Sequence, residues 1–282
     1  MNDVGNIQWF PGHMTKTRRL IEADLKMVDA VVEITDARIP ESSRNPILDE
    51  LVKDKPRIIL MNKCDYADET ATRAWKQYYE KKGIRVLTCD CRSGKGLNAF
   101  LPEVKRLLAE LIERRKKRGM IGKALRLMVV GIPNVGKSSF INRMAKTKKT
   151  KVGDKPGVTR GKQWVSIDKD VELLDMPGIL WPKFDDQLAA QRLAFTGAIK
   201  DDVMDTEALA RALGAVLKEQ YPELLNARYK LTGDEDILRD IAKSRGMLVS
   251  GGEPDTERAA AALLDEYRGG KIGRITLEKP GR

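Results

Sequence analysis

The chain has 282 residues, of which 41% are apolar, enough to build one large core or two ordinary ones. Its 52 Lys and Arg outnumber its 41 Asp and Glu, and the net charge of +11 favours a polyanionic partner. No stretch approaches the ~20 consecutive apolar residues of a membrane span, and the N-terminus lacks a signal-peptide pattern, so composition excludes a membrane protein and favours a cytoplasmic one. The three cysteines lack zinc-type spacing and are expected to be reduced side chains.

The first half of the chain alternates predicted helices and strands. Beyond the turn at Pro11-Gly12, one helical stripe holds Met14, Arg18, Ile21 and Leu25 and another holds Lys16, Arg19 and Lys26. Apolar and β-branched runs predict buried strands at 30–35, 57–62 and 84–89, with helices between and after them at about 69–82 and 97–118. This alternation is typical of a parallel α/β sheet.

The second half begins with a strand at 125–131 and a hairpin pattern at 163–167 and 171–175, which makes six expected strands. From about residue 185 the pattern becomes helical, with helices expected at 206–220, 235–246 and 255–270. Asp255 or Thr256 suits an N-cap, and Gly246 and Gly269 suit C-terminal ends. We therefore expect two domains, at 1–183 and 184–282.

The segment GIPNVGKS, 131–138, fits the phosphate loop G-x-x-x-x-G-K-[ST] between a strand and a helix, where its mechanism requires it. Its backbone N–H groups would surround phosphates, Lys137 would reach the β and γ phosphates, and the Ser138 hydroxyl would bind magnesium. A flexible glycine turn is the less favoured alternative. The nucleotide-binding residues predicted here are Asn134, Val135, Gly136, Lys137, Ser138 and Ser139.

Two shorter patterns follow the phosphate loop. In DMPG, 175–178, Asp175 is expected to hold magnesium through water and Gly178 to offer its N–H to the γ-phosphate. In KPGVTRG, 155–161, Thr159 is expected to coordinate magnesium when the γ-phosphate is present. Each pattern alone is a weak signal, and their order along the chain strengthens both.

The segment NKCD, 62–65, closes a predicted strand and suggests the base that is bound. Asn62 and Lys63 belong to this loop, and the Asp65 carboxylate can accept from the two N–H groups of guanine, whereas adenine would leave it unpaired at about 1–3 kcal/mol per group. This favours GTP over ATP. In DCRSGKG, 90–96, the backbone N–H groups of Asp90 and Cys91 are expected to receive the guanine carbonyl, although a plain surface loop fits the same letters.

These motifs stand in rotated order, because the guanine-reading segments precede the phosphate loop. The same sheet can close if the segment 97–124 joins the former chain ends. The segment after Asp175 and Gly178 then leads directly into the C-terminal helices, so nucleotide state has a short path to that domain.

Together, WFPGHM (9–14), DAR (36–38), NKCD, GIPNVGKSS, PGVT, DMPGIL and GKIGRITLE resemble the circularly permuted GTPase family over nearly the whole chain. The resemblance implies an α/β, Ras-like P-loop GTPase sheet in permuted order, followed by a smaller all-α C-terminal domain. It implies GTP and GDP as ligands with magnesium, and a cytoplasmic bacterial factor for late assembly of the large ribosomal subunit. The implied partners are a large-subunit precursor and its ribosomal RNA, contacted partly through the helical domain, with no membrane partner; we expect a monomer when free.

Hydrolysis needs a group that orients water, and the Gln that many GTPases place after the Asp-x-x-Gly glycine is Ile179 here. Slow intrinsic turnover is therefore expected. His13, the single histidine, is the candidate catalytic residue, since a neutral imidazole can accept from water and the resembling family has a histidine in this motif. The alternative is that His13 caps a helix or contacts an RNA phosphate. Asn134 is a candidate potassium ligand, as the resemblance suggests, or a simple turn residue.

Three basic clusters favour RNA as the polyanion, although any one of them is more often a solvated face. They lie on the first helix, at 114–118, and around 146–162. Two functions remain: a GTPase activated by its ribosomal partner, and an RNA-binding module in which GTP is a switch and hydrolysis is incidental. A P-loop ATPase or kinase is disfavoured by Asp65.

Overall fold

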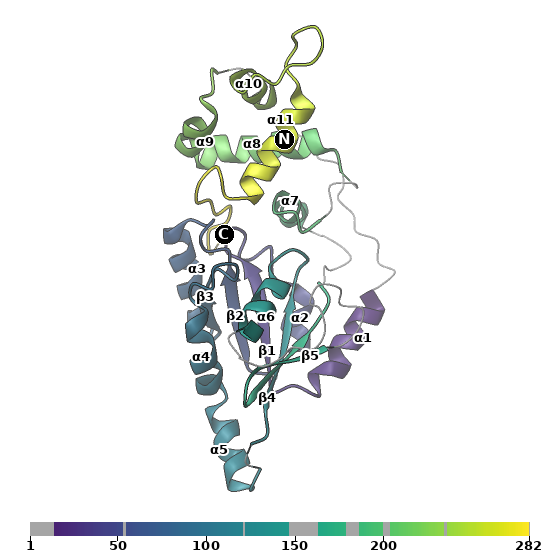
Figure 1. Ribbon diagram of the computed structural model, residues 1–282, viewed down its shortest axis with the longest axis vertical. Helices are drawn as coiled ribbons and strands as arrows, with labels where there is room; N and C mark the ends of the chain where they lie inside the picture. Colours follow the sequence, from purple (N-terminus) through teal and green to yellow (C-terminus); the bar gives the residue numbers. More distant parts are fainter. Residues whose placement is uncertain are drawn as a thin grey trace.

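The computed structural model describes residues 14–52, 55–120, 122–146, 163–178, 186–199, 204–233 and 236–281. A six-stranded sheet with helices on both faces lies beneath a separate group of helices (Figure 1). Its strands are β1 (Ala30–Asp36), β2 (Arg57–Asn62), β3 (Arg85–Thr88), β4 (Leu125–Gly131), β5 (Gln163–Asp168) and β6 (Val171–Asp175). The order is β3-β2-β1-β4-β6-β5, parallel between neighbours except for the antiparallel pair β5 and β6. The α/β prediction is confirmed.

Side chains alternate along each strand, so the two faces of the sheet pack into different hydrophobic clusters. Val32 and Ile34 of β1 face the cluster that contains Phe100 and Phe140, whose rings lie edge to face with centroids 5.0 Å apart. Val31, the neighbour of Val32, faces the opposite side, where α1 and α2 cover the sheet. Burial of both faces explains why these strands read as continuous apolar runs in the sequence.

The helices around the sheet are α1 (Met14–Leu25), α2 (Pro46–Leu51), α3 (Glu69–Lys81), α4 (Phe100–Leu107), α5 (Ala109–Lys117) and α6 (Lys137–Lys146). They differ from the predicted helices in two places. The short helix α2 was not predicted, because six residues are too few to show helical periodicity. The helix predicted at 97–118 begins as a 3₁₀ turn (Leu97–Ala99) and is interrupted at Leu108, where φ is −102° and ψ is 18°.

The C-terminal helices are α7 (Gln187–Phe195), α8 (Thr206–Gln220), α9 (Pro222–Tyr229), α10 (Ile237–Ser244) and α11 (Thr256–Arg268). Four of them begin with an aspartate N-cap whose carboxylate accepts backbone N–H groups of the first turn, namely Asp186, Asp205, Asp236 and Asp255. Helix α9, which was not predicted, begins at Pro222, a residue suited to the first helical position. Within the described ranges, no helix is both long and apolar enough to span a bilayer.

The tail after α11 returns to the loops of the sheet (Figure 1). Ile275 N–H donates to Tyr66 O at 2.9 Å, and Leu277 N–H donates to Arg38 O at 2.8 Å. Trp75 Nε1 donates to Glu278 O at 3.0 Å. The tail therefore fastens the helical group to the sheet beside the segment 62–65.

Candidate nucleotide-binding site

The predicted motifs meet because they follow parallel strands. In register, Asp36 of β1 pairs with Asn62 of β2, and Met61 pairs with Thr88 of β3. On the other side of β1, Ile34 pairs with Gly131 of β4. The ends of β1, β2, β3, β4 and β6 therefore share one edge, at which ligands of open α/β sheets bind.

Lys137 of the phosphate loop is buried, and its Nζ donates to Gly131 O at 3.1 Å and Ile132 O at 2.9 Å. Burial lowers the pKa of Lys137 to about 8, against the opposing attraction of Asp175. The two loop carbonyls thus hold the ammonium group at the position that the phosphates are expected to contact.

Asp175 and Gly178 approach the same lysine from β6. Asp175 pairs in register with Val129 of β4, and a Cβ on Gly178 would lie 3.1 Å from Lys137 Nζ. The same Cβ would lie 3.0 Å from Pro133 Cα, so a larger residue here would require the phosphate loop to shift by a few tenths of an ångström. Ser138 is exposed at the start of α6. A hydroxyl and a carboxylate are hard oxygen donors that suit magnesium, so this donor set fits the metal predicted there.

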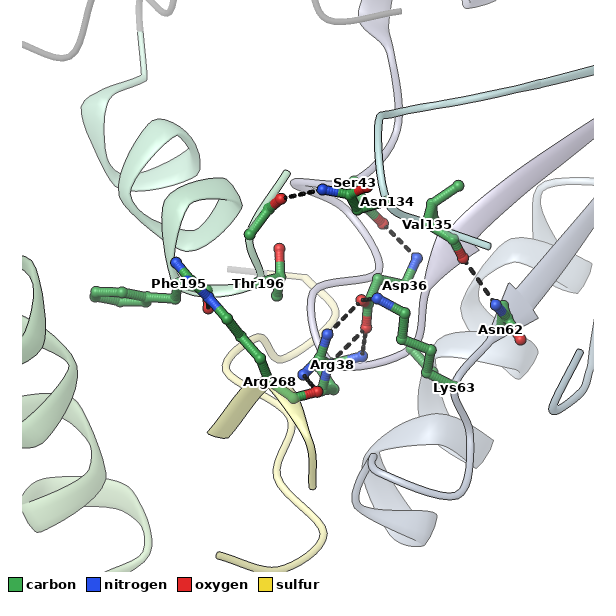
Figure 2. Close-up of polar contacts among 12 residues, drawn as sticks. Asp36, Arg38, Ser43, Asn62, Lys63, Asn134, Val135, Phe195, Thr196 and Arg268 are labelled. Carbon is green, nitrogen blue, oxygen red and sulfur yellow. Dashed lines mark hydrogen bonds and ion pairs between the residues drawn. The ribbon is translucent and has the colours of Figure 1, made fainter. Parts of the chain in front are cut away.

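Asn62 links the guanine-reading loop to the phosphate loop (Figure 2). Its Nδ2 donates to Val135 O at 2.7 Å, and its Oδ1 accepts from Cys91 N–H at 2.9 Å. Gly136 lies so close that a Cβ there would overlap Asn62 Nδ2. The buried side chain of Asn62 therefore connects its own loop to the phosphate loop and to the loop at 90–96.

Asp65 carries a buried oxygen suited to a ligand. Its Oδ1 has no hydrogen-bond partner among the described residues. Because an unpaired buried carboxylate oxygen is costly, such an atom at the end of a strand indicates a missing donor. Guanine offers two N–H donors to this position.

Asp90 and Cys91 are engaged within the chain, so their predicted contact with guanine stays a prediction. Asp90 N–H donates to Lys95 O at 2.9 Å, and Cys91 N–H donates to Asn62 Oδ1. The Asp90 carboxylate accepts from the N–H groups of Arg92 and Ser93, which forms a local turn. In this arrangement both N–H groups of the predicted pair already donate within the chain, and neither is free to donate to a guanine carbonyl.

Two residues of these loops adopt left-handed backbone without being glycine: Lys63 (φ 60°) and Asn134 (φ 57°). Such conformations persist where surrounding contacts fix them. Lys63 Nζ lies 3.0 Å from Asp36 Oδ2, and Asn134 Nδ2 donates to Gly197 O at 2.7 Å (Figure 2). The role of Asp36 was missed by sequence reasoning, although the DAR segment was noted.

Three predicted residues lie outside the described ranges: His13, Thr159 and Ile179. Ser139 is described and is exposed beside Ser138 in the first turn of α6.

The sheet, the phosphate loop and the guanine-reading loop define a GTPase of the P-loop class whose motifs stand in permuted order. A family model described as "50S ribosome-binding GTPase" matches residues 126–226. Ribosome biogenesis GTPase A of Bacillus licheniformis is 48% identical over 97% of this chain and 98% of its own length. The chain belongs to the ribosome biogenesis GTPase A family.

More distant relatives share the same length and fold. Ribosome biogenesis GTPase A of Thermotoga maritima is 34% identical over 97% of this chain and 95% of its own. A solved structure titled as GDP-bound YlqF superposes with a TM-score of 0.66 at 29% identity, over 94% of this chain and all (100%) of that one. A second, titled as GNP-bound YlqF from T. maritima, gives a TM-score of 0.64 at 30% identity, over 94% and 99%. The predicted resemblance and the predicted GTPase class are confirmed.

Proposed function

We propose that this cytoplasmic GTPase acts late in assembly of the large ribosomal subunit, that it is slow alone, and that its ribosomal partner activates it. The observation that carries the nucleotide part is the buried, unpartnered Asp65 Oδ1 at the same sheet edge as the phosphate loop. Family membership and the names of the relatives support the ribosomal part.

In this proposal the phosphate loop binds GTP and GDP. Lys137 exchanges its bonds to Gly131 O and Ile132 O for phosphate oxygens, and loop N–H groups at 134–139 surround the phosphates. Ser138 and Asp175 would hold magnesium, the latter through water, and Thr159 would join them when the γ-phosphate is present. Bound there, the metal would supply positive charge for the β and γ phosphates.

Hydrolysis requires attack of water on the γ-phosphorus as the bond to the bridging oxygen breaks. We assign water orientation to His13, because the aliphatic side chain of Ile179 cannot form a hydrogen bond. The side chain of Asn134 lies in the phosphate loop, where a potassium ion would supply positive charge near the leaving oxygen. Equal turnover in potassium and sodium would exclude that ion.

RNA is the proposed polyanionic partner, and α5 is the exposed helix best suited to it. None of its residues is buried, and its last turn carries Arg114, Arg115, Lys116 and Lys117. Arg115 pairs with Asp29 and Lys116 with Glu113, whereas Arg114 and Lys117 have no ion pair within the described part of the chain. Two cations that are not neutralised in this way leave net charge for phosphates.

The alternative is an RNA-binding module in which GTP is only a switch. GTP turnover of the wild type and of His13→Ala, each with and without purified large-subunit precursors, separates the two. We expect precursors to stimulate the wild type and the variant to lose that stimulation while it binds GTP normally. Unchanged stimulation in His13→Ala would favour the alternative.

A further inference from the structure

Polar contacts that leave the nucleotide loops form a closed ring through the helical domain (Figure 2). The ring begins at Lys63, whose ammonium group lies 3.0 Å from Asp36 Oδ2. The same carboxylate accepts from Arg38 through both oxygens, at 2.9 Å from Nε and 2.8 Å from Nη2. Asp36 and Arg38 are each 1% exposed, so this ion pair is shielded from solvent.

The second segment of the ring enters the helical domain. Arg38 Nη1 donates to Tyr267 O at 3.1 Å and to Arg268 O at 3.3 Å, which are the last carbonyls of α11. Tyr267 O also accepts from Gly270 N–H at 3.1 Å, just beyond the helix. A guanidinium group at this end supplies further donors and a positive charge that complements the helix dipole. The guanine loop is therefore joined to the end of α11 through two side chains.

The third segment closes the ring. Arg268 donates to the end of α7, from Nε to Phe195 O at 3.2 Å and from Nη2 to Ala194 O at 2.9 Å. Just after α7, Gly197 O accepts from Asn134 of the phosphate loop. Asn62, next to Lys63, bonds to the phosphate loop from the other side.

We propose that Asp36, Arg38 and Arg268 are positioning residues, which fix the guanine loop and phosphate loop relative to each other through the ends of α7 and α11. This rests on the proposed guanine site. Lys63 and Asn134, at which the ring meets the nucleotide loops, are the non-glycine residues of these loops with left-handed backbone, a conformation that persists where surrounding contacts fix it. By reciprocity, a ligand that fixes the loops also fixes the helical domain.

The ring is best tested at Arg268, which is distant in sequence from every nucleotide motif. Removal of Arg38 would leave Asp36 buried beside one partner, and loss of a partner in a buried pair commonly prevents folding. Arg268→Gln instead removes the bonds from this side chain to Phe195 O and Ala194 O and leaves the buried pair of Asp36 and Arg38 in place. The matched control is Arg228→Gln, since Arg228 is another helical-domain arginine that bonds to Glu266 and lies outside the ring.

The first measurement is the Kd of a fluorescent GDP for the full chain. We expect Arg268→Gln to weaken binding about 5-fold or more, the lower end of coupling between sites, while Arg228→Gln binds like the wild type. Equal affinity in all three proteins would overturn the ring. If the wild type does not bind GDP, the proposed guanine site fails instead, so the two failures are distinguishable.

The second measurement uses wild type alone and needs no variant to fold. Hydrogen exchange is followed with and without saturating GDP for amides at 194–199 and 267–271, with α10 as the internal control because it lies outside the ring. We expect GDP to slow exchange at the ring segments more than in α10, beyond the uniform protection given by ligand binding. Equal protection in ring and control segments would overturn the proposal.

Discussion

At the scale of single residues, Lys137 shows how the phosphate loop is arranged without nucleotide. Its ammonium group is buried and bonded to two carbonyls of its own loop, and burial lowers its pKa to about 8. Phosphates would replace those carbonyls with full negative charge and raise that pKa. The protonation of one residue therefore links nucleotide affinity to pH.

The expected result is a GDP affinity that falls as pH rises above about 8. Between the pKa of the free site and the higher pKa of the bound site, the complex holds a proton that the free protein has lost, so affinity drops by up to about tenfold per pH unit. Titration calorimetry from pH 7 to 9 measures it. Lys137→Arg, which stays charged throughout, is the control and should show no such slope; a flat wild-type profile would contradict the assignment.

The carboxylate of Asp65 is the group expected to select guanine over other bases. Replacing it with Asn puts an N–H donor where guanine also offers donors, so Asp65→Asn should weaken GDP binding by at least about tenfold and improve xanthosine diphosphate relative to GDP. Competition against a fluorescent nucleotide measures both. Asp68→Asn, at the N-cap of the following helix, is the control, and unchanged base preference in Asp65→Asn would remove the assignment.

The sequence predicted that Asp65, Lys137 and Gly178 lie at one edge, because each follows a strand and parallel strand ends meet there. It did not predict the contacts of Arg38 and Arg268. The acceptors of Arg38 are backbone carbonyls 229 and 230 residues away, and a carbonyl leaves no trace in residue identity. The engagement of Asp90 and Cys91 with Lys95 and Asn62 is likewise a property of loop conformation.

At the scale of elements, the tail after α11 has no helix or strand in its described residues, yet it makes several contacts with other parts of the chain. Ile275 and Leu277 are buried, and Glu278 accepts from Arg192 at 3.2 Å and from Ser42. Burial raises the pKa of the Glu278 carboxyl, which those donors oppose. The sequence predicted the strands and the helices with clear periodicity, but the tail has neither period, because its order comes from partners on the sheet.

The stability of the chain should depend on this tail. Leu277→Ala leaves a cavity between tail and sheet and should lower the free energy of unfolding by about 2–5 kcal/mol, measured by urea denaturation. Val249→Ala, at a side chain that is 47% exposed in the helical domain, should change it by less than about 0.5 kcal/mol. Equal effects of the two substitutions would mean that the tail is only loosely attached.

At the scale of the whole molecule, the basic end of helix α5 and the nucleotide edge lie apart. Helix α5 lies at the far end of the sheet from the helical domain, and the nucleotide edge lies between the sheet and that domain (Figure 1). A partner that contacts both ends would span the long axis of the molecule. Binding of that partner to the helical domain would then change the conformation of the nucleotide loops through the contacts of Asn134 and the tail.

The basic helix gives a test of RNA binding. Neutralising three cations at the end of α5 should lower the salt dependence of binding to large-subunit precursors, by about 0.7–0.9 in slope for each RNA phosphate that the helix no longer neutralises. The variant is Arg114→Gln, Lys117→Gln and Arg118→Gln. A control with the same net charge carries the change on α3, as Arg73→Gln, Lys76→Gln and Lys81→Gln. If the slope falls equally in both variants, net charge rather than α5 is responsible.

The most direct test of a nucleotide-controlled ribosome factor is the affinity of the full chain for purified large-subunit precursors, measured by sedimentation with a non-hydrolysable GTP analogue, with GDP and without nucleotide. Coupling between the two sites predicts binding about 5-fold or more tighter with the GTP analogue than with GDP. Affinity that is the same in all three states would contradict it, because nucleotide and ribosome would then bind independently.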